Sequence, residues 1–138
     1  MMDDCERLAE LQLLIDELAH RALNGSVILV EGRRDREALD ALGIRGEIMM
    51  TSQKQLFTLC EELARSGGDV IILSDWDDRG EEVAGLVQTY LEADGLRPDL
   101  EIRNKVRQLV RKEIKDVENL HRYIARLREI CSTKPQPY

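Results

Sequence analysis

Acidic side chains follow two apolar runs of the chain, and this pattern suits a divalent cation. Val27–Val30 is followed at once by Glu31, and Asp75 comes two residues after Val70–Leu73. Asp77 lies two residues further on, so in an extended segment it points the same way as Asp75 and adds an oxygen donor. Mg²⁺ is usually held by one or two carboxylates, with water and substrate phosphate completing the octahedron. Glu31, Asp75 and Asp77 are therefore predicted ligands of Mg²⁺, with Mn²⁺ as the alternative metal.

The same aspartates also have a purely structural interpretation. Asp75, Asp77 and Asp78 precede a predicted helix, where carboxylates cap free N–H groups and stabilise the helix by about 1 kcal/mol. Gly32 and Gly80, after the two acidic points, permit close approach of backbone or phosphate. One D-x-D does not decide between metal binding and capping. An acid after an apolar run occurs twice, however, and this favours the metal site.

Bringing these acids together requires parallel strands that lie side by side. Apolar runs without polar alternation at 27–30 and 70–73 are typical of strands covered on both faces, and 47–50 is a weaker third candidate. Apolar periodicity predicts helices over 34–42, 52–65 and 79–93. This alternation predicts an α/β fold with a parallel sheet of three to four strands, and such sheets bind ligands at the carboxyl ends of their strands.

Local signals orient two of these helices. Ser52-x-x-Gln55 is typical of a capping box that opens the 52–65 helix. The side chains predicted to face the core are Leu56, Leu59, Cys60 and Leu63 in this helix and Val83, Leu86, Val87 and Tyr90 in the next. Trp76 is expected to point away from the metal, and packing against a neighbouring helix is favoured over stacking on a base.

Helical segments flank the predicted sheet. The apolar stripe of residues 3–23 either covers the sheet or mediates a homodimer or another protein complex. Residues 99–130 are predicted to be a C-terminal helical extension in which Asp116 caps the second helix, although Leu100–Ile102 fits a fourth strand equally well. Because there is no linker or repeat, 1–138 is predicted to be one domain with its core at about 26–95.

Charge is divided unevenly along the chain. The formal net charge is −7, but residues 97–138 hold 11 Lys/Arg against 6 Asp/Glu, a net of +5 that leaves −12 for residues 1–96. The acidic part suits Mg²⁺, whereas the basic tail either meets phosphates or forms a solvated helix face. We expect a cytoplasmic protein without a membrane partner, because no apolar run approaches about 20 residues and the N-terminus does not resemble a secretory signal.

Cysteine and histidine provide no further site. Cys5, Cys60 and Cys131 are odd in number and far apart, so we expect buried or incidental thiols rather than a disulfide framework or a zinc site. His20 and His121 fall on predicted helices away from the acids and are interpreted as surface or interface residues.

The acidic motifs resemble those of a known family. Val30-Glu31-Gly32, followed by Asp75-Trp76-Asp77-x-x-Gly80-Glu81, is similar to the TOPRIM domain of topoisomerases, primases, OLD-family nucleases and the ribonuclease that matures 5S ribosomal RNA. The similarity spans about 26–95 and is greatest to short stand-alone TOPRIM proteins of prokaryotes and to that ribonuclease. It implies a Rossmann-like, three-layer fold, with Glu31 as general acid or base and Asp75 and Asp77 as Mg²⁺ ligands.

Residues near these motifs have expected secondary roles. Many relatives have lysine at the position of Arg33, so the charge is retained and a phosphate contact or a solvated helix start is expected there. Asp35, like an acid in the glutamate motif of the ribonuclease, is expected to be a second-metal or supporting acid, or else an N-terminal helix residue. Asp78 and Glu81 have the same two interpretations.

The resemblance implies Mg²⁺-dependent phosphodiester chemistry on RNA or DNA. A topoisomerase would need a tyrosine domain and a strand gate, and a primase further domains, for which 138 residues leave no room. The expected function is thus a small nuclease or the metal-site subunit of a nucleic-acid-processing complex. The alternative is a non-catalytic nucleic-acid or ribonucleoprotein binding module. A nucleotide sensor is disfavoured, because G-x-G-x-x-G and G-x-x-x-x-G-K-[ST] are both absent.

Overall fold

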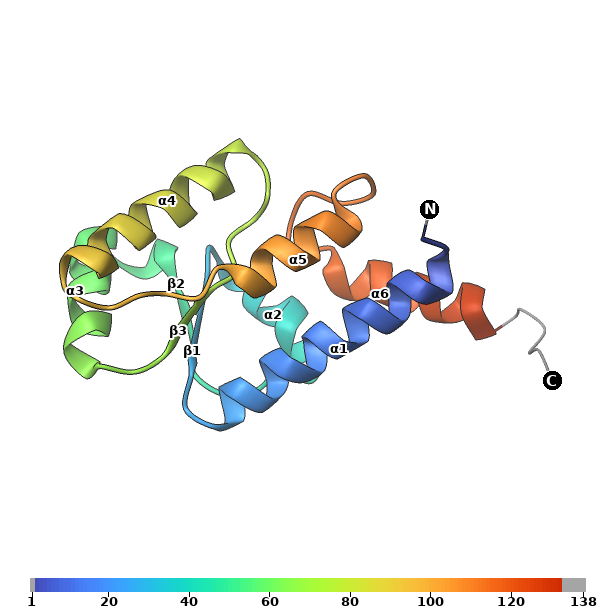
Figure 1. The fold of residues 1–138 in the computed structure, drawn as a ribbon, viewed down its shortest axis with the longest axis horizontal. Helices are drawn as coiled ribbons and strands as arrows, with labels where there is room; N and C mark the ends of the chain where they lie inside the picture. Colours follow the sequence, from blue (N-terminus) through green and yellow to red (C-terminus); the bar gives the residue numbers. More distant parts are fainter. Residues whose placement is uncertain (1, 133–138) are drawn as a thin grey trace.

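The computed structural model describes residues 2–132, in which helices surround a small central sheet (Figure 1). The elements are α1 (Asp4–Leu23), β1 (Val27–Val30), α2 (Arg33–Ala41), β2 (Ile48–Met50), a 3-10 turn η1 (Thr51–Gln53), α3 (Leu56–Ser66), β3 (Val70–Ile72), α4 (Asp78–Ala93), α5 (Glu101–Val110) and α6 (Leu120–Ser132). All three predicted strands are present. None of the described helices combines the length and the apolar character needed to cross a membrane.

The sheet is parallel, with strand order β2-β1-β3. Ile28 at its centre is level with Ile48 on one side and Ile71 on the other. Beyond β3, Asp99 makes a single parallel bridge to Ile71. The segment goes no further as a strand, because the Asp99 carboxylate accepts a hydrogen bond from the backbone N–H of Glu101 (2.7 Å), where α5 begins. The open choice at Leu100–Ile102 is thereby settled in favour of a helix start.

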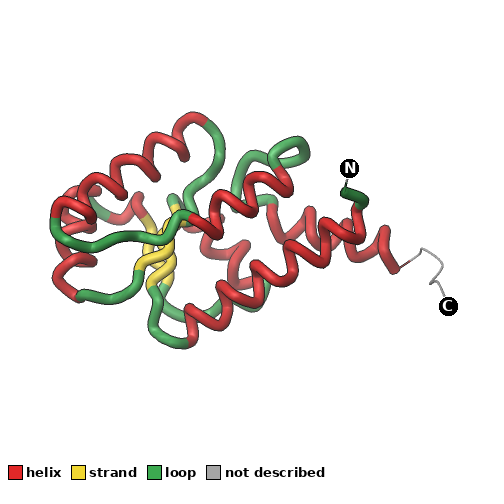
Figure 2. Tube along the Cα trace, in the orientation of Figure 1, coloured by secondary structure: helices red, strands yellow, loops and turns green. Residues whose placement is uncertain are grey.

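Side chains alternate between the two faces of the sheet, and each face is covered by helices. Val27 and Leu29 of β1 pack with α3 and α4, whereas Ile28 and Val30 pack with the core that α1, α5 and α6 form and to which α2 contributes Leu39. In Figure 2 the strands accordingly lie between two groups of helices. The result is the expected α/β arrangement of three layers with a three-stranded parallel sheet, consistent with a Rossmann-like fold.

The first and last described helices pack against each other. Leu11, Ile15 and Leu18 of α1 are buried in the same core as Ile124 and Leu127 of α6. The apolar stripe of α1 therefore covers one face of the sheet, which is one of the two roles expected for it.

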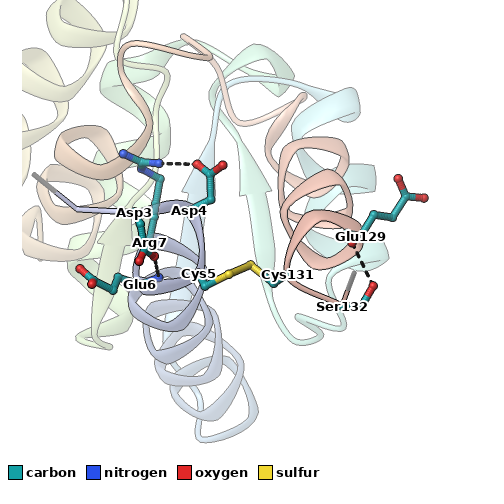
Figure 3. The surroundings of a disulfide bond; sticks show 8 residues. All are labelled: Asp3, Asp4, Cys5, Glu6, Arg7, Glu129, Cys131 and Ser132. Atoms are coloured by element: carbon teal, nitrogen blue, oxygen red, sulfur yellow. Dashed lines mark hydrogen bonds and ion pairs between the residues drawn. A yellow bond between two sulfur atoms is a disulfide. The ribbon is translucent and has the colours of Figure 1, made fainter. Parts of the chain in front are cut away.

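A disulfide joins the beginning of α1 to the end of α6, between Cys5 and Cys131 (Figure 3). Their Cα atoms are 5.6 Å apart although 126 residues separate them in sequence. The expectation that these two cysteines are incidental thiols was wrong, because separation along the chain does not reveal that the two helices lie together. Cys60 is the buried free thiol that we expected.

Two local predictions also need correction. The capping box at Ser52–Gln55 is absent: residues 51–53 form η1, and Gln55 stands before α3 without a side-chain cap. In α4, Leu86 is 39% exposed, while Ala84 and Leu91 are buried beside Val87. The buried stripe of α4 runs through Gly80, Ala84, Val87 and Leu91 at steps of four, three and four residues, which turns Leu86 outward and leaves Val83 and Tyr90 partly buried beside it.

Candidate functional site

Glu31 and Asp75 meet where β1 and β3 end. A carboxylate oxygen of Glu31, Oε2, accepts a hydrogen bond from the backbone N–H of Asp75 at 2.8 Å. After β1 the chain turns to α2 on one face of the sheet, and after β3 it turns to α4 on the other. Such a divergence between neighbouring strands opens the crevice in which α/β sheets bind ligands.

A hollow of about 400 Å³ lies at this point. Glu31, Asp75 and Asp35 line it together with three arginines, Arg33, Arg34 and Arg79. The side chains of these arginines are 84%, 78% and 86% exposed. The hollow thus has carboxylates inside it and long, exposed arginine side chains at its border. This arrangement is complementary to a divalent cation bound together with a polyanion.

The carboxylate of Asp75 is held from the C-terminal part of the chain. Its Oδ1 accepts a hydrogen bond from the backbone N–H of Val117 at 2.9 Å. Burial raises the pKa of Asp75 to about 7, against the lowering effect of this hydrogen bond and with the negative charges of Asp35 and Glu31 adding to the rise. Sequence reasoning assigned no site role to the segment around Val117.

Asp35 lines the same hollow as Glu31 and Asp75. It is 7% exposed, and its Oδ2 accepts a hydrogen bond from the backbone N–H of Gly32 at 3.0 Å. Burial raises the pKa of Asp35, in spite of that bond, and the charges of Glu31 and Glu118 act in the same direction. The helix-start interpretation of Asp35 is confirmed by this hydrogen bond, and its role as a second-metal or supporting acid stays a prediction.

Asp77 and Asp78 occupy the start of α4. Asp77 is the N-cap residue, and its Oδ1 accepts a hydrogen bond from the backbone N–H of Gly80 at 2.7 Å. Asp77 does not line the hollow, and Asp78 lies in the first turn of the helix. Within residues 2–132, no group of three or more Asp, Glu, His or Cys side chains is arranged to hold a metal ion. The structure therefore brings Glu31 and Asp75 together and leaves Asp77 in the capping position.

Gly80 is required by close packing against residues 74–77, which we call the acidic loop. A Cβ atom at this position would lie 1.7 Å from the carbonyl oxygen of Asp75, which no side chain can tolerate. The carbonyl of Gly80 in turn accepts a hydrogen bond from the hydroxyl of buried Ser74 at 2.8 Å. A Cβ at Gly32, by contrast, would meet nothing within 4 Å. Of these two glycines, Gly80 alone has the close-approach role.

Arg103 of α5 supports the same loop, and sequence reasoning missed it. Its side chain is 2% exposed and donates hydrogen bonds to the carbonyl oxygens of Ser74 (2.8 Å) and Asp75. Arg103 and Arg107 both pair with Glu81, at 3.2 and 2.9 Å. Burial alone would raise the pKa of Glu81, but these two arginines outweigh it and lower that pKa. Glu81 therefore holds the guanidinium groups of Arg103 and Arg107 beside the acidic loop.

A signal for Arg103 was present in the sequence. Arg103, Val106 and Val110 follow one another at steps of three and four residues, so the arginine falls on the apolar stripe of α5. A charged residue on an inward stripe is buried only when it has partners, and it therefore points to a polar structure beneath the helix.

Trp76 points away from the hollow, into the core. The side chain is 8% exposed, and its Nε1–H donates to the carbonyl oxygen of Ile114 at 2.7 Å. The backbone N–H of Trp76 donates to Lys115 O at 3.1 Å. The favoured packing interpretation is confirmed, and Trp76 fastens the acidic loop to the segment between α5 and α6.

The residues present fit Mg²⁺ as a two-carboxylate site. Glu31, with a side chain 16% exposed, and Asp75 come from neighbouring strands and line one hollow. Two carboxylates are enough for this ion, since water and substrate oxygens usually complete its shell. The raised pKa values of Asp75 and Asp35 reflect burial and mutual repulsion of like charges, and a divalent cation between the acids would relieve that repulsion.

Comparison with known proteins finds similar chains that belong to one family. The chain is 44% identical over 123 residues to a UPF0292 protein of Methanosarcina barkeri, covering 89% of this chain and 86% of the relative. It is 40% identical to a UPF0292 protein of Thermococcus onnurineus, covering 84% of each. A solved structure of a putative protein from Aquifex aeolicus is similar at 29% identity, with a TM-score of 0.68 over 79% of this chain and 96% of that one. No protein-family model matches the sequence.

Proposed function

This chain belongs to the UPF0292 family, and we propose that it carries out Mg²⁺-dependent phosphodiester chemistry on nucleic acid with a TOPRIM-type site. The simplest form of this function is a small nuclease, and a metal-site subunit of a larger complex would use the same residues. The observation that carries the proposal is the contact between Glu31 and Asp75 at the divergence of β1 and β3.

The residues of the hollow divide into two roles. Glu31 and Asp75 would hold Mg²⁺, or Mn²⁺ in its place, and the bound ion would supply charge stabilisation at a phosphate oxygen. Arg33, Arg34 and Arg79 carry fixed positive charges at the border, where they can contact neighbouring phosphates. Asp35 adds negative charge beside the pair and orients Gly32 through its hydrogen bond.

Hydrolysis needs a group that accepts a proton. The water oxygen forms a bond to phosphorus, one P–O ester bond breaks, and the water proton passes through a base to the leaving sugar oxygen. If Asp75 alone held the ion, the Glu31 carboxylate would be the group to accept that proton: one of its oxygens accepts the Asp75 N–H, and the other, Oε1, lies 3.8 Å from the exposed guanidinium of Arg79.

Cleavage assays test the proposal. Purified protein is incubated with labelled structured RNA, single-stranded DNA and duplex DNA, with Mg²⁺ or Mn²⁺ and with chelator, and the native chain is compared with Glu31→Gln and Asp75→Asn. We expect metal-dependent cleavage of one substrate class that both substitutions abolish. Cleavage that survives both would come from a contaminating nuclease and would contradict the proposal.

The position of Asp77 favours one second candidate, a non-catalytic nucleic-acid binding module. In this reading Asp77 only caps α4, and the acid pair lacks the third carboxylate that the TOPRIM resemblance implies. Binding that weakens steeply with salt, without cleavage under any metal condition, would favour the module.

A further inference from the structure

A second hollow, of about 690 Å³, lies between α1 and α5, which pack against each other (Figure 1). It shares no lining residue with the hollow that contains Glu31 and Asp75. We call it the α1–α5 hollow. The proposed function makes no use of it, so its shape and chemistry need a separate explanation.

Apolar side chains gather in the α1–α5 hollow. Leu13 of α1 is 68% exposed and does not belong to the apolar core. It lines the hollow together with half-buried Met2 and Leu109 and with buried Leu14. One exposed apolar side chain is ordinary on a protein surface, whereas several that line one hollow are typical of a surface that another protein covers. Leu23, which is 76% exposed at the end of α1, does not line this hollow.

The two helices bring opposite charges to the α1–α5 hollow. Glu10 and Glu17 line it from α1, and their separation of seven residues places them on one face of that helix. Lys105 lines it from α5, with a side chain that is 55% exposed. Lys105 pairs with Glu101 at 2.9 Å, but an ammonium group has three donors and can bind a second carboxylate. Free acids thus lie on the α1 side and an exposed cation on the α5 side.

The charged and the apolar positions of the two helices lie level with one another. The pKa of Lys105 is raised by its hydrogen bond with Glu101 and, as a smaller effect, by the negative charge of Glu17 across the hollow. Leu13 precedes Glu17 by four residues, and Leu109 follows Lys105 by four. Because α1 and α5 run in opposite directions, the two leucines are level at one height and the opposite charges at another (Figure 1).

We propose that a second copy of this chain covers the α1–α5 hollow, in a two-fold dimer that sets α1 of each copy on α5 of the other. A two-fold contact makes every pair twice. An axis along the hollow brings Leu13 of one copy to the partner's Leu109 and Glu17 to the partner's Lys105. Apolar surface thereby meets apolar surface, and each acid meets a cation.

A nucleic-acid strand suits this hollow less well than a second copy does. Glu10 and Glu17 repel phosphates, and the two cations of the hollow, Arg7 and Lys105, have acidic partners in their own helices at 3.0 and 2.9 Å. A second copy also removes Leu13 from water, which a phosphate chain does not do. The dimer does not depend on the proposed function, and it would carry two Glu31–Asp75 pairs in one particle.

Sedimentation velocity of the whole chain tests the dimer. The protein is measured from about 1 to about 200 µM, because interfaces of ordinary size include ones that dissociate in the micromolar range. The native chain should form dimers, and Leu13→Gln should raise the dissociation constant at least about tenfold. Leu23→Gln is the matched control, because it changes an exposed leucine of the same helix outside the hollow, and it should leave the constant unchanged. A native chain that stays monomeric, or equal effects of the two substitutions, would overturn the proposal.

Charge reversal tests which helices meet. Glu17→Lys and Lys105→Glu each place like charges across the interface, so each variant alone should dimerise more weakly than the native chain. An equal mixture of the two variants restores opposite charges at both contacts of the two-fold, and it should dimerise more strongly than either variant alone. A mixture that associates no better than its components would overturn the contact of α1 with the partner's α5.

Discussion

At the residue scale, the behaviour of the site depends on how Asp75 holds its charge. Burial disfavours the charged form of its carboxyl group, and so do the negative charges of Asp35 and Glu31. The hydrogen bond from the N–H of Val117 favours the charged form. The folded chain therefore favours either a proton or a cation at this position, and protons and metal should compete for it.

This competition gives a pH dependence of defined sign. Folding raises the pKa of Asp75 from 3.8 to about 7, so the metal-free folded state keeps a proton that the unfolded state releases. This group therefore lowers the free energy of unfolding as pH rises from about 4 to about 7. Urea unfolding at pH 5 and pH 8 should show Asp75→Asn gaining stability relative to the native chain at the higher pH. A difference that does not change with pH would contradict the assignment.

Substitution of Asp77 distinguishes metal binding from helix capping by this residue. Asparagine caps helices about as well as aspartate, so Asp77→Asn should leave the melting temperature almost unchanged. Because Asp77 lies outside the hollow, the rise in melting temperature caused by Mg²⁺ should also be retained, whereas Asp75→Asn should lose it. Loss of the Mg²⁺ effect in Asp77→Asn would show that Asp77 leaves its cap to bind the metal.

At the element scale, the strands and the acids that follow them were predictable from sequence. The contacts that hold Asp75 in place were not. Val27–Val30 and Val70–Ile72 are continuous apolar runs, so their burial and the place of Glu31 and Asp75 follow from local pattern. The Val117 and Arg103 contacts join positions 42 and 28 residues from Asp75, and such contacts depend on tertiary packing. Asp77 was ambiguous because a ligand and a cap have the same local sequence.

The support from α5 can be measured. Arg103→Met should lower the free energy of unfolding by about 2–4 kcal/mol, because the carbonyl groups of Ser74 and Asp75 lose their donor. Arg107→Met is the matched control: it removes a more exposed partner of the same Glu81 and should cost under about 1 kcal/mol. Equal effects of the two substitutions in chemical denaturation would contradict the special role of Arg103.

At the scale of the whole molecule, α1 and α6 are linked covalently on the side of the sheet that also carries α5. Val117 and Trp76 are buried in the core that these helices share, and Val117 in turn donates its N–H to Asp75, so the ends of the described chain pack against the residues that support the site. The disulfide escaped prediction because the antiparallel contact of these two helices is not visible in the spacing of the cysteines.

Reduction of the disulfide should therefore destabilise the fold without abolishing it. Closing a loop with a sequence separation of 126 residues restricts the unfolded chain, and reduction should lower the free energy of unfolding by about 2–4 kcal/mol. Denaturation with and without dithiothreitol measures this effect. Cys131→Ser should unfold identically in both conditions, while Cys60→Ser should keep the dependence; a native chain indifferent to reductant would refute the prediction.

The central claim is that Glu31 and Asp75 together bind one divalent cation. Calorimetric titration of the native chain with Mn²⁺ at pH 8, where Asp75 has lost its proton, tests it most directly. We predict binding of about one ion, weakened at least about tenfold by either Glu31→Gln or Asp75→Asn, with both variants still folded. Mn²⁺ binding that is absent from the native chain, or equally strong in both variants, would contradict the account.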